Sequence, residues 1–536
     1  MKSTLSVNQK IAIVSQIKSD WSATNSNTYV GIGHVKMWSA MDAVIPDIDT
    51  SVDGFNTVFD NLIAIKKISD SDMSLVVPRV DWANNTTYDA YDNTVDMFSK
   101  NKTTKRSGNV QVFTSNTSVV GTNTSFVADF VVGNHISYYN FSNGITEDRE
   151  VISVSNNTFL TINSAFTYAV TSNTYHTVVN EAPNYALDFY VRNSVDQVFI
   201  CVFNNSGALS TQMPQISLGG NLPQNPYIQT ADGYKWKYLY TIPSGVKAKF
   251  FTTDWMPVLT DTNVQNAVVD GRIDIIKILN GGVGYNQNVV SSNATIITIT
   301  GDGTGANATA VVSANGTITD LNILSGGSGY TYANVVATAG LTGSNAAFDA
   351  VIPPHNGHGF NPVYDLGATN LMVCLELVAD EGGAIPVLSS NNSDTIDYHQ
   401  ISIIQNPRMT ANVSNVASGS VYNLTTGIST GPLPAGSGYT VDDTAFQGVS
   451  LDVATFFGTI VNWDSVNNKV YLNNIRGTFV PFTSLRATQL GANITAFAEF
   501  PPLIKVYTGE VLYVENRASV SRSPNQTEQI KLIIEL

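Results

Sequence analysis

The chain has 536 residues, too many for one ordinary core, so we expect two to four domains. Only 13% of the residues are charged and the formal net charge is −15, so the acidic surface argues against general nucleic-acid binding. No apolar run is long enough to cross a bilayer, and the N-terminus lacks the apolar stretch of a signal peptide. We therefore expect assembly in a cytoplasm without a membrane partner, with Cys201 and Cys374 as buried thiols in apolar runs.

Helical periodicity is confined mostly to the first seventy or so residues. Residues 7–21 place apolar side chains at helical spacing, and Ser6 is a suitable cap. Residues 55–68 are predicted to form a second helix through Val58, Leu62 and Ile65. The rest alternates short β-branched runs with Gly, Asn and Ser turns. This predicts a mainly β, multidomain fold, with a β-sandwich or β-barrel-like core, a few N-terminal helices and inserted β-modules.

Two early acidic groups invite a functional interpretation. Asp47, Asp49 and Asp53 resemble a calcium loop, but the spacing is wrong for an EF-hand, so we interpret them as a solvated loop. Glu147, Asp148 and Glu150 lie in a β-stretch at 107–178 and could supply the carboxylate pair of a glycosidase. Because no aromatic cleft signature surrounds them, we interpret them as edge-strand charges that discourage wrong pairing.

Residues 232–243 form the most informative strand of the sequence. Alternation places four aromatic side chains on one face of it: Tyr234, Trp236, Tyr238 and Tyr240. Lys235 and Lys237 fall on the other face. We predict a buried aromatic face, with a binding surface as the less favoured alternative.

An internal repeat follows, since residues 272–285 recur as 317–330. Each copy is a period-2 strand that ends in Gly-Gly-x-Gly-Tyr, a turn in which glycine supplies positive φ and tyrosine anchors the packing. The turn residues are Gly281, Gly282, Gly284, Tyr285, Gly326, Gly327, Gly329 and Tyr330. Two copies are too few for a solenoid, so we expect residues 271–353 to form a small paired β-module.

The remaining site-like patterns lack a required partner. Residues 301–306 imitate a dinucleotide glycine loop, but a strand-like segment follows where a helix is needed. His355 and His358 could coordinate zinc, but only Asp365 is near in sequence, so a tight turn is the favoured interpretation. We therefore predict no catalytic, cofactor-binding or metal-binding residues, and no enzyme. Residues 413–497 form a third β-stretch, and residues 529–536 alternate as a half-buried final strand.

Several segments together carry a family resemblance. In chain order they are 77–82, 187–201, 232–243, 400–407, 513–517 and 525–530. They resemble the baseplate wedge subunit of contractile-tailed, T-even-like phages, the gene-product-eight type. The resemblance covers a little over half of the chain: 1–106 (with the helices), 179–270, 354–412 and 498–536. The stretches 107–178, 271–353 and 413–497 are inserted modules, as in the longer, cyanophage-like versions.

The resemblance implies a structural role. It implies a homodimer that contacts neighbouring wedge subunits resembling gene products six, seven and ten, in the tail baseplate of the virion. Such a late protein takes part in virion assembly and in the switch that precedes sheath contraction, without a cofactor. Glu515, Asn516 and Arg517 are a candidate organising point for a contact, or an internal pair that braces the last strands. The alternative function is a carbohydrate-binding or carbohydrate-cleaving tail protein.

Overall fold

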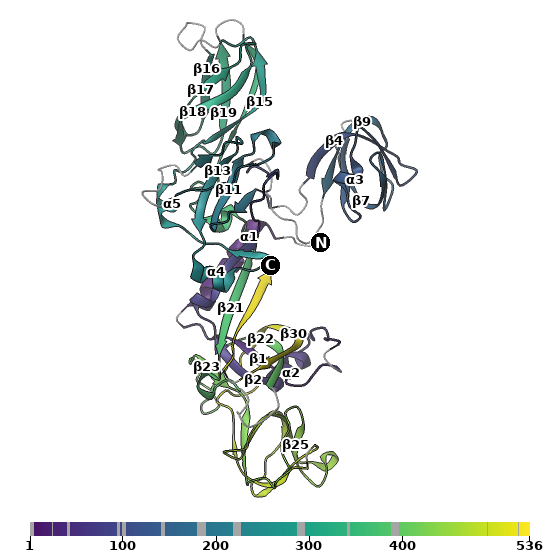
Figure 1. The fold of residues 1–536 in the computed structure, drawn as a ribbon, viewed down its shortest axis with the longest axis vertical. Coiled ribbons are helices and arrows are strands. Elements are labelled where there is room, and N and C mark those ends of the chain that lie inside the picture. Colours follow the sequence, from purple (N-terminus) through teal and green to yellow (C-terminus); the bar gives the residue numbers. More distant parts are fainter. Residues whose placement is uncertain are drawn as a thin grey trace. The chain divides into compact units, whose positions relative to one another are not determined.

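The structure is a computed structural model, and it is mainly β, with few helices. It describes residues 5–23, 25–39, 43–93, 97–98, 103–140, 145–179, 189–217, 227–286, 295–339, 343–386, 396–489, 491–523 and 525–535. Figure 1 shows the fold as a ribbon. The chain divides into two compact units. One contains Met1–Ile11 and Val76–Thr369, and the other contains Ala12–Leu75 and Asn370–Leu536. Among the described residues, no helix has both the length and the apolarity to span a membrane.

The central sheet of the first unit has four antiparallel strands in the order β10-β11-β13-β12. Their bounds are Tyr190–Arg192, Gln197–Phe203, Lys235–Thr241 and Tyr227–Gln229. Strands β11 and β13 are buried along almost their whole length, because both lie inside the sheet. The smaller elements of this unit are α4 (Ser244–Phe250), β14 (Trp255–Pro257, paired with β3, Met73–Pro78), α5 (Thr262–Ala267), α6 (Pro362–Asp365) and the 3-10 turn Asn205–Gly207.

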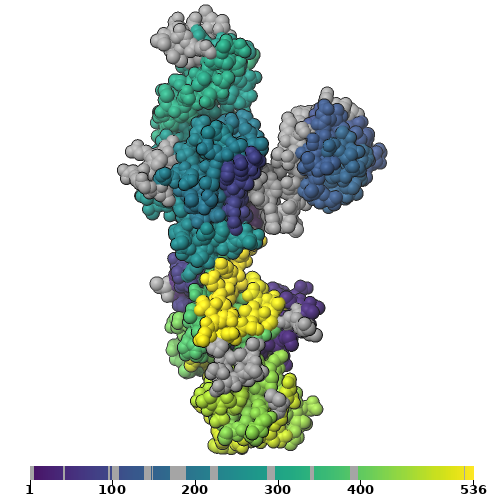
Figure 2. Space-filling model, in the orientation of Figure 1, coloured from purple at the N-terminus to yellow at the C-terminus, as the bar shows by residue number. Residues whose placement is uncertain are grey.

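The first inserted module is a closed six-stranded barrel in the order β4-β5-β8-β7-β6-β9. In that order the strands are Thr103–Val112, Ser118–Thr122, Phe159–Ile162, Ile145–Asn156, His135–Asn140 and Val170–Val179, with helix α3 at Phe126–Asp129. Its first and last residues, Thr103 and Val179, are paired with each other. Figure 2 shows this barrel, in blue, as a rounded body. It extends a few residues beyond the predicted 107–178.

The tandem repeat forms a module in which the two copies exchange strands. The strands are β15 (Ile275–Val283), β16 (Thr295–Gly301), β17 (Thr304–Val312), β18 (Ile318–Ser328), β19 (Ala333–Ala339) and β20 (Ser344–Val351). The first strand of each repeat pairs with the third strand of the other, β15 with β20 and β18 with β17, and the middle strands β16 and β19 pair with each other. Neither repeat therefore completes its own sheet, which gives the module an internal two-fold arrangement.

The glycine turns hold the two repeats together. Gly282 and Gly327 have φ of 64° and 65°, and the third glycine of each turn also has positive φ, as the motif predicts. The first glycine has ordinary φ but allows close approach, since a Cβ at Gly281 would overlap the backbone oxygen of Ile318. A Cβ at Gly326 would meet the matching oxygen of the first repeat. The turn tyrosines, Tyr285 and Tyr330, are buried in the core of the module.

The second unit is built on a five-stranded sheet in the order β23-β2-β1-β22-β30. Their bounds are Val421–Asn423, Leu62–Lys67, Thr28–Gly33, Ile396–Gln405 and Glu510–Arg522. In the same unit β21 (Asn370–Val378) pairs along its whole length with the final strand β31 (Thr527–Glu535). Ile530 and Leu532 on β31 are buried, as alternation predicts, while Leu536 lies outside the described residues. Short 3-10 turns lie at Asp70–Asp72, Glu381–Gly383 and Leu451–Val453.

A second closed barrel is inserted in this unit, in the order β24-β27-β26-β25-β28-β29. In that order its strands are Thr426–Thr430, Lys469–Gly477, Phe456–Asp464, Thr444–Gln447, Thr483–Ala487 and Asn493–Phe500. Gly427 near its start is paired with Phe500 at its end. The barrel ends three residues after the predicted 413–497 and begins later than predicted.

Of the two helices predicted near the N-terminus, the first is correct and the second is partly wrong. Helix α1 (Val7–Ser22) begins after Ser6, whose Oγ accepts a hydrogen bond from the backbone of Gln9, and the Gln9 side chain accepts one from Ser6 N. Helix α2 ends at Asn61 (Val52–Asn61), so the predicted helix 55–68 is wrong beyond that point. Leu62 to Ile65 are all buried in β2, which lies between β1 and β23. A strand buried on both faces reads as a continuous apolar run that a helical pattern also fits.

Candidate functional site

The aromatic strand β13 is core, which confirms the favoured interpretation. Tyr234, Trp236, Tyr238 and Tyr240 are at most 1% exposed. The rings of Tyr234 and Trp236 stack at 5.5 Å between centroids. The tyrosine hydroxyls donate inward, for instance from Tyr234 to the Ala208 oxygen and from Tyr240 to the Pro257 oxygen. Burial raises the pKa of Tyr238 to about 12, so the hydroxyl stays protonated at neutral pH.

The opposite face of β13 holds a buried lysine, which alternation alone did not predict. Lys237 is 3% exposed and its Nζ lies 4.7 Å from the ring centroid of Tyr227 on the neighbouring strand β12. The Tyr227 hydroxyl hydrogen-bonds to Asp274, and Arg272 Nε lies 2.8 Å from Asp274 Oδ1. Burial lowers the pKa of Lys237 to about 8, and the carboxylates of Asp274 and Asp365 oppose that shift only in part. The cluster therefore contains both signs of charge in a poorly solvated space.

This ionic cluster surrounds a cavity of about 10 Å³, roughly the space of one water molecule. His358 lies on its wall, with Nδ1 3.0 Å from Asp365 Oδ1, and Asp365 Oδ2 accepts a hydrogen bond from Gly359 N. The ring of Tyr91 meets His358 edge-on, and burial, assisted by the nearby carboxylate of Asp365, raises the pKa of Tyr91 to about 12. A space of this size does not admit an organic substrate, so the cluster acts as an internal brace.

The two histidines considered as zinc ligands do not converge. His355 is 85% exposed and lies 3.7 Å from a carboxylate oxygen of Asp270, whereas His358 is buried against Asp365. Gly357 and Gly359 both have positive φ, which gives the tight turn that the sequence favours. Among the described residues no group of three or more His, Cys, Asp or Glu side chains is placed to hold a metal ion.

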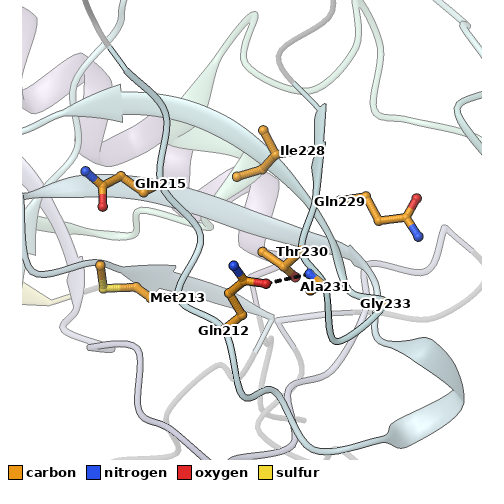
Figure 3. Close-up of a pocket in the computed structure, with 8 residues that line it drawn as sticks. All are labelled: Gln212, Met213, Gln215, Ile228, Gln229, Thr230, Ala231 and Gly233. Atoms are coloured by element: carbon orange, nitrogen blue, oxygen red, sulfur yellow. Dashed lines mark hydrogen bonds between the residues drawn. The ribbon is translucent and has the colours of Figure 1, made fainter.

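A larger cavity, of about 860 Å³, lies beside strand β12 in the same sheet (Figure 3). We call it the amide groove. It is lined by Gln212, Met213, Gln215, Ile228, Gln229, Thr230, Ala231 and Gly233. Its two walls are an extended segment and the edge strand, which are joined where Gln212 Oε1 accepts a hydrogen bond from Ala231 N. The lining contains three amide side chains but no charged and no aromatic residue.

Polar side chains, half-buried at Asp232 and buried at Asn193 and Gln197, hold the walls of the amide groove in place. Asp232 accepts hydrogen bonds from the backbone amides of Thr211 and Gln212 through one oxygen, and from Thr230 Oγ1 through the other. Burial raises its pKa, but these hydrogen bonds lower it by more, so the carboxylate stays ionised. Behind the first wall, Asn193 donates to Pro214 O at 2.8 Å and Gln197 to Ile216 O at 2.7 Å. The groove is thus preformed.

The Glu515-Asn516-Arg517 segment lies on strand β30. Arg517 Nη2 donates to Glu515 Oε1 at 3.0 Å, and both side chains are about 30% exposed, so the internal pair exists. Asn516 is opposite Gln400 in the ladder, and its Oδ1 accepts a hydrogen bond from Gln400 Nε2 at 2.8 Å. The segment therefore braces β22 against β30 and leaves part of the Arg517 and Glu515 side chains accessible.

The carboxylates of the first barrel have a structural role. Strand β7 pairs with β6 over Ile145–Glu150 and with β8 only from Val151 onward, so Glu147 and Glu150 lie on a stretch that has a ladder partner on one side. Glu147 is 8% exposed and accepts hydrogen bonds from the backbone amides of Thr167 and Tyr168 and from Arg149 Nη2. Through these hydrogen bonds Glu147 holds the turn before the last strand of the barrel.

The other site-like sequence patterns form ordinary structural elements. Residues 301–306 lead into strand β17, so no helix N-terminus is available for a phosphate. Asp47 and Asp49 are exposed in a loop, as predicted, but Asp53 lies in the first turn of α2, where it complements the helix dipole. Cys201 and Cys374 are buried thiols, as predicted.

Sequence reasoning missed both cavities beside the central sheet. The only signal for the ionic cluster was a lysine at an inward position of a strand that turned out to be interior. No local motif marks the amide groove, because its walls come from two separate segments. Neither a protein-family model nor a curated protein matches this chain.

Proposed function

We propose that this chain is a structural subunit of the baseplate wedge of a contractile phage tail. The observation that carries the proposal is that segments quoted for the resemblance pair with one another. In one sheet, β11 pairs with β13 from Gln197 to Phe203. In another, β22 pairs with β30, with Gln400 opposite Asn516 and Ile401 opposite Glu515. Segments that are distant in sequence but adjacent in a sheet are what a shared structural core requires.

The three modules support the same proposal. The first and last strands of each are paired with each other, through Thr103 with Val179, Ile275 with Val351, and Gly427 with Phe500. A segment whose ends are paired can be added to a chain without separating the flanking elements. This is the organisation expected of a longer family member built on the same core.

As a wedge subunit the chain acts by holding its neighbours rather than by chemistry. We propose that it forms a homodimer, binds adjacent wedge proteins, belongs to the virion and is assembled in the host cytoplasm. No cofactor and no catalytic step enter this proposal. Contacts of this permanent kind bury on the order of 2,000 Å² or more and are relatively apolar. They should therefore persist at salt concentrations that screen surface charge.

The carbohydrate alternative receives less support. A glycosidase site needs a cleft that combines aromatic rings with two carboxylates, one of them free to exchange a proton. The amide groove is lined by neither. Glu147, the best acidic candidate in the sequence, accepts three hydrogen bonds in the wall of a barrel.

Co-expression with the products of neighbouring tail genes tests the proposal. We expect a dimer by light scattering and co-purification with at least one wedge protein at about 0.5 M salt, several times above the screening range of surface pairs. Arg517→Ala should weaken one of these contacts, and Arg486→Ala, a change at a half-buried arginine elsewhere in the same unit, should not. A chain that stays monomeric and never co-purifies with tail proteins would defeat the proposal.

A further inference from the structure

Strand β12 is the edge strand of the central sheet, and it lies along the amide groove. In the β12–β13 hairpin, Thr230 N donates to Tyr234 O, and the ladder continues with Gln229 opposite Lys235, Ile228 opposite Trp236 and Tyr227 opposite Lys237. Antiparallel pairs alternate between those that exchange backbone hydrogen bonds and those that do not. Counting from Thr230, the pair of Ile228 is hydrogen-bonded, and the backbone groups of Gln229 and Tyr227 point away from β13.

These outward groups face the space where a further strand would lie. Within the part of the chain that the structure describes, no hydrogen bond joins the backbone of Gln229 or Tyr227 to a segment beyond β12. Gln229 and Ile228 both line the groove from β12, and their side chains leave the strand in opposite directions (Figure 3). The edge strand thus presents two N–H and C=O pairs at alternate residues, about 7 Å apart at 3.3–3.4 Å per residue.

We propose that the amide groove binds an extended, uncharged polar peptide segment of another protein, which adds a strand to the free edge of β12. Only an extended polypeptide offers matching N–H and C=O pairs at the same spacing, and strand addition of this kind is a common mode of peptide recognition. The far wall, residues 212–215, then lies along the other edge of the added strand.

The lining selects the chemistry of that peptide. Gln212, Gln215 and Gln229 are exposed amides that both donate and accept, and the apolar side chains of Met213 and Ile228 lie between them. Asn, Gln, Ser and Thr side chains would satisfy these amides. A charged side chain would lose hydration in the groove without gaining an opposite charge. A saccharide lacks the backbone pairs, and the groove has no aromatic ring for a sugar face.

This inference does not depend on the proposed function, because it concerns one groove and one class of ligand. The test uses the full chain and a displayed library of random dodecapeptides. We expect selected peptides to be poor in charged residues and rich in Asn, Gln, Ser and Thr. Selective N-methylation of their alternate backbone amides should abolish binding, since it removes the donors of the ladder.

Two substitutions at Gln229 distinguish binding through the backbone of β12 from binding through the Gln229 side chain. Gln229→Pro removes the outward N–H, and proline is tolerated on an edge strand where that group faces solvent. It should weaken the selected peptides by about 10-fold or more, whereas Gln229→Ala, which keeps the N–H, should weaken them by about 3-fold at most. Should the proline variant fold poorly, hydrogen exchange on the unaltered chain decides instead. Bound peptide should then slow exchange of the Gln229 and Tyr227 amides.

Three results would overturn the inference. The first is that the library yields no binder. The second is that the selected peptides bind Gln229→Pro as well as Gln229→Ala and do not slow exchange of the Gln229 and Tyr227 amides. The third is that a neutral oligosaccharide such as maltohexaose, and not a peptide, protects those amides.

Discussion

Replacing Lys237 by methionine should stabilise the protein, because the folded chain holds this charge in a poorly solvated site. Burial lowers the pKa of Lys237 from its ordinary value of 10.5 to about 8. Each pKa unit corresponds to about 1.4 kcal/mol, so charged Lys237 reduces the free energy of unfolding by about 3 kcal/mol. Methionine keeps an apolar side chain of similar length and removes the charged Nζ that lies over the Tyr227 ring. Asp274 and Asp365 keep Arg272 and His358 as partners.

The pH dependence follows from the direction of the shift. Below about pH 8 the lysine is protonated in both the folded and unfolded chains, so the whole penalty is present. Between about pH 8 and 10.5 the folded chain loses the proton before the unfolded chain does, and the penalty disappears. The unmodified protein should therefore gain about 1 kcal/mol from this group between pH 7 and pH 9. Measurements should stay below pH 10, where unfolded tyrosines ionise.

Urea unfolding followed by tryptophan fluorescence at pH 7, 8 and 9 measures this effect, with buried Trp236 as a reporter on the same strand. Lys237→Met should raise the unfolding free energy by about 2–3 kcal/mol at pH 7 and by less at pH 9. Lys235→Met, at a half-buried lysine two residues away, should change it by about 0.5 kcal/mol or less at every pH. A destabilised Lys237→Met protein, or one that keeps the pH-dependent gain, would refute the reasoning.

Three further outcomes are expected. Gly327→Ala should lower the unfolding free energy by about 2 kcal/mol or more in a thermal melt, because φ at Gly327 is 65° and a Cβ there would overlap a backbone oxygen of β17. The control Gly245→Ala places its Cβ in open space on α4 and should not destabilise the protein. Glu147→Gln should cost about 1–3 kcal/mol by weakening three charge-assisted hydrogen bonds, and Glu150→Gln, at a half-buried position, should cost less. Turnover of a surface polysaccharide that is lost in either variant would contradict the structural role. Replacing residues 276–350 by a short Gly/Ser linker should leave a soluble folded chain by circular dichroism, because the strands at its ends are paired, and an insoluble product would count against an inserted module.

The fold could be predicted from the sequence where a local pattern is compatible with one conformation only. The Gly-Gly-x-Gly-Tyr turns need positive φ, and Gly282 and Gly327 have it. The alternating aromatic residues of β13 are buried as predicted. The prediction from sequence was wrong from Leu62 onward, because the apolar run there fits both a helix and a buried strand. Only the pairing of β2 with β1 and β23 makes this segment a strand.

The cavities could not be predicted for a different reason. The amide groove forms between residues 212–215 and the edge strand, and the position of β12 at the edge is a property of the sheet order. The lowered pKa of Lys237 depends first on its burial and then on Asp274 and Asp365, which are far from it in sequence. Neither relation produces a recognisable spacing of residues in the sequence.

The central claim, that this chain is a wedge subunit, is tested most directly in the assembled particle. Antibodies against the purified chain, applied to intact phage particles that encode it and viewed by negative-stain electron microscopy, report where the protein resides. We expect label at the baseplate end of the tail on most particles. Label on the head or along the tail shaft, or particles that lack the protein altogether, would contradict it.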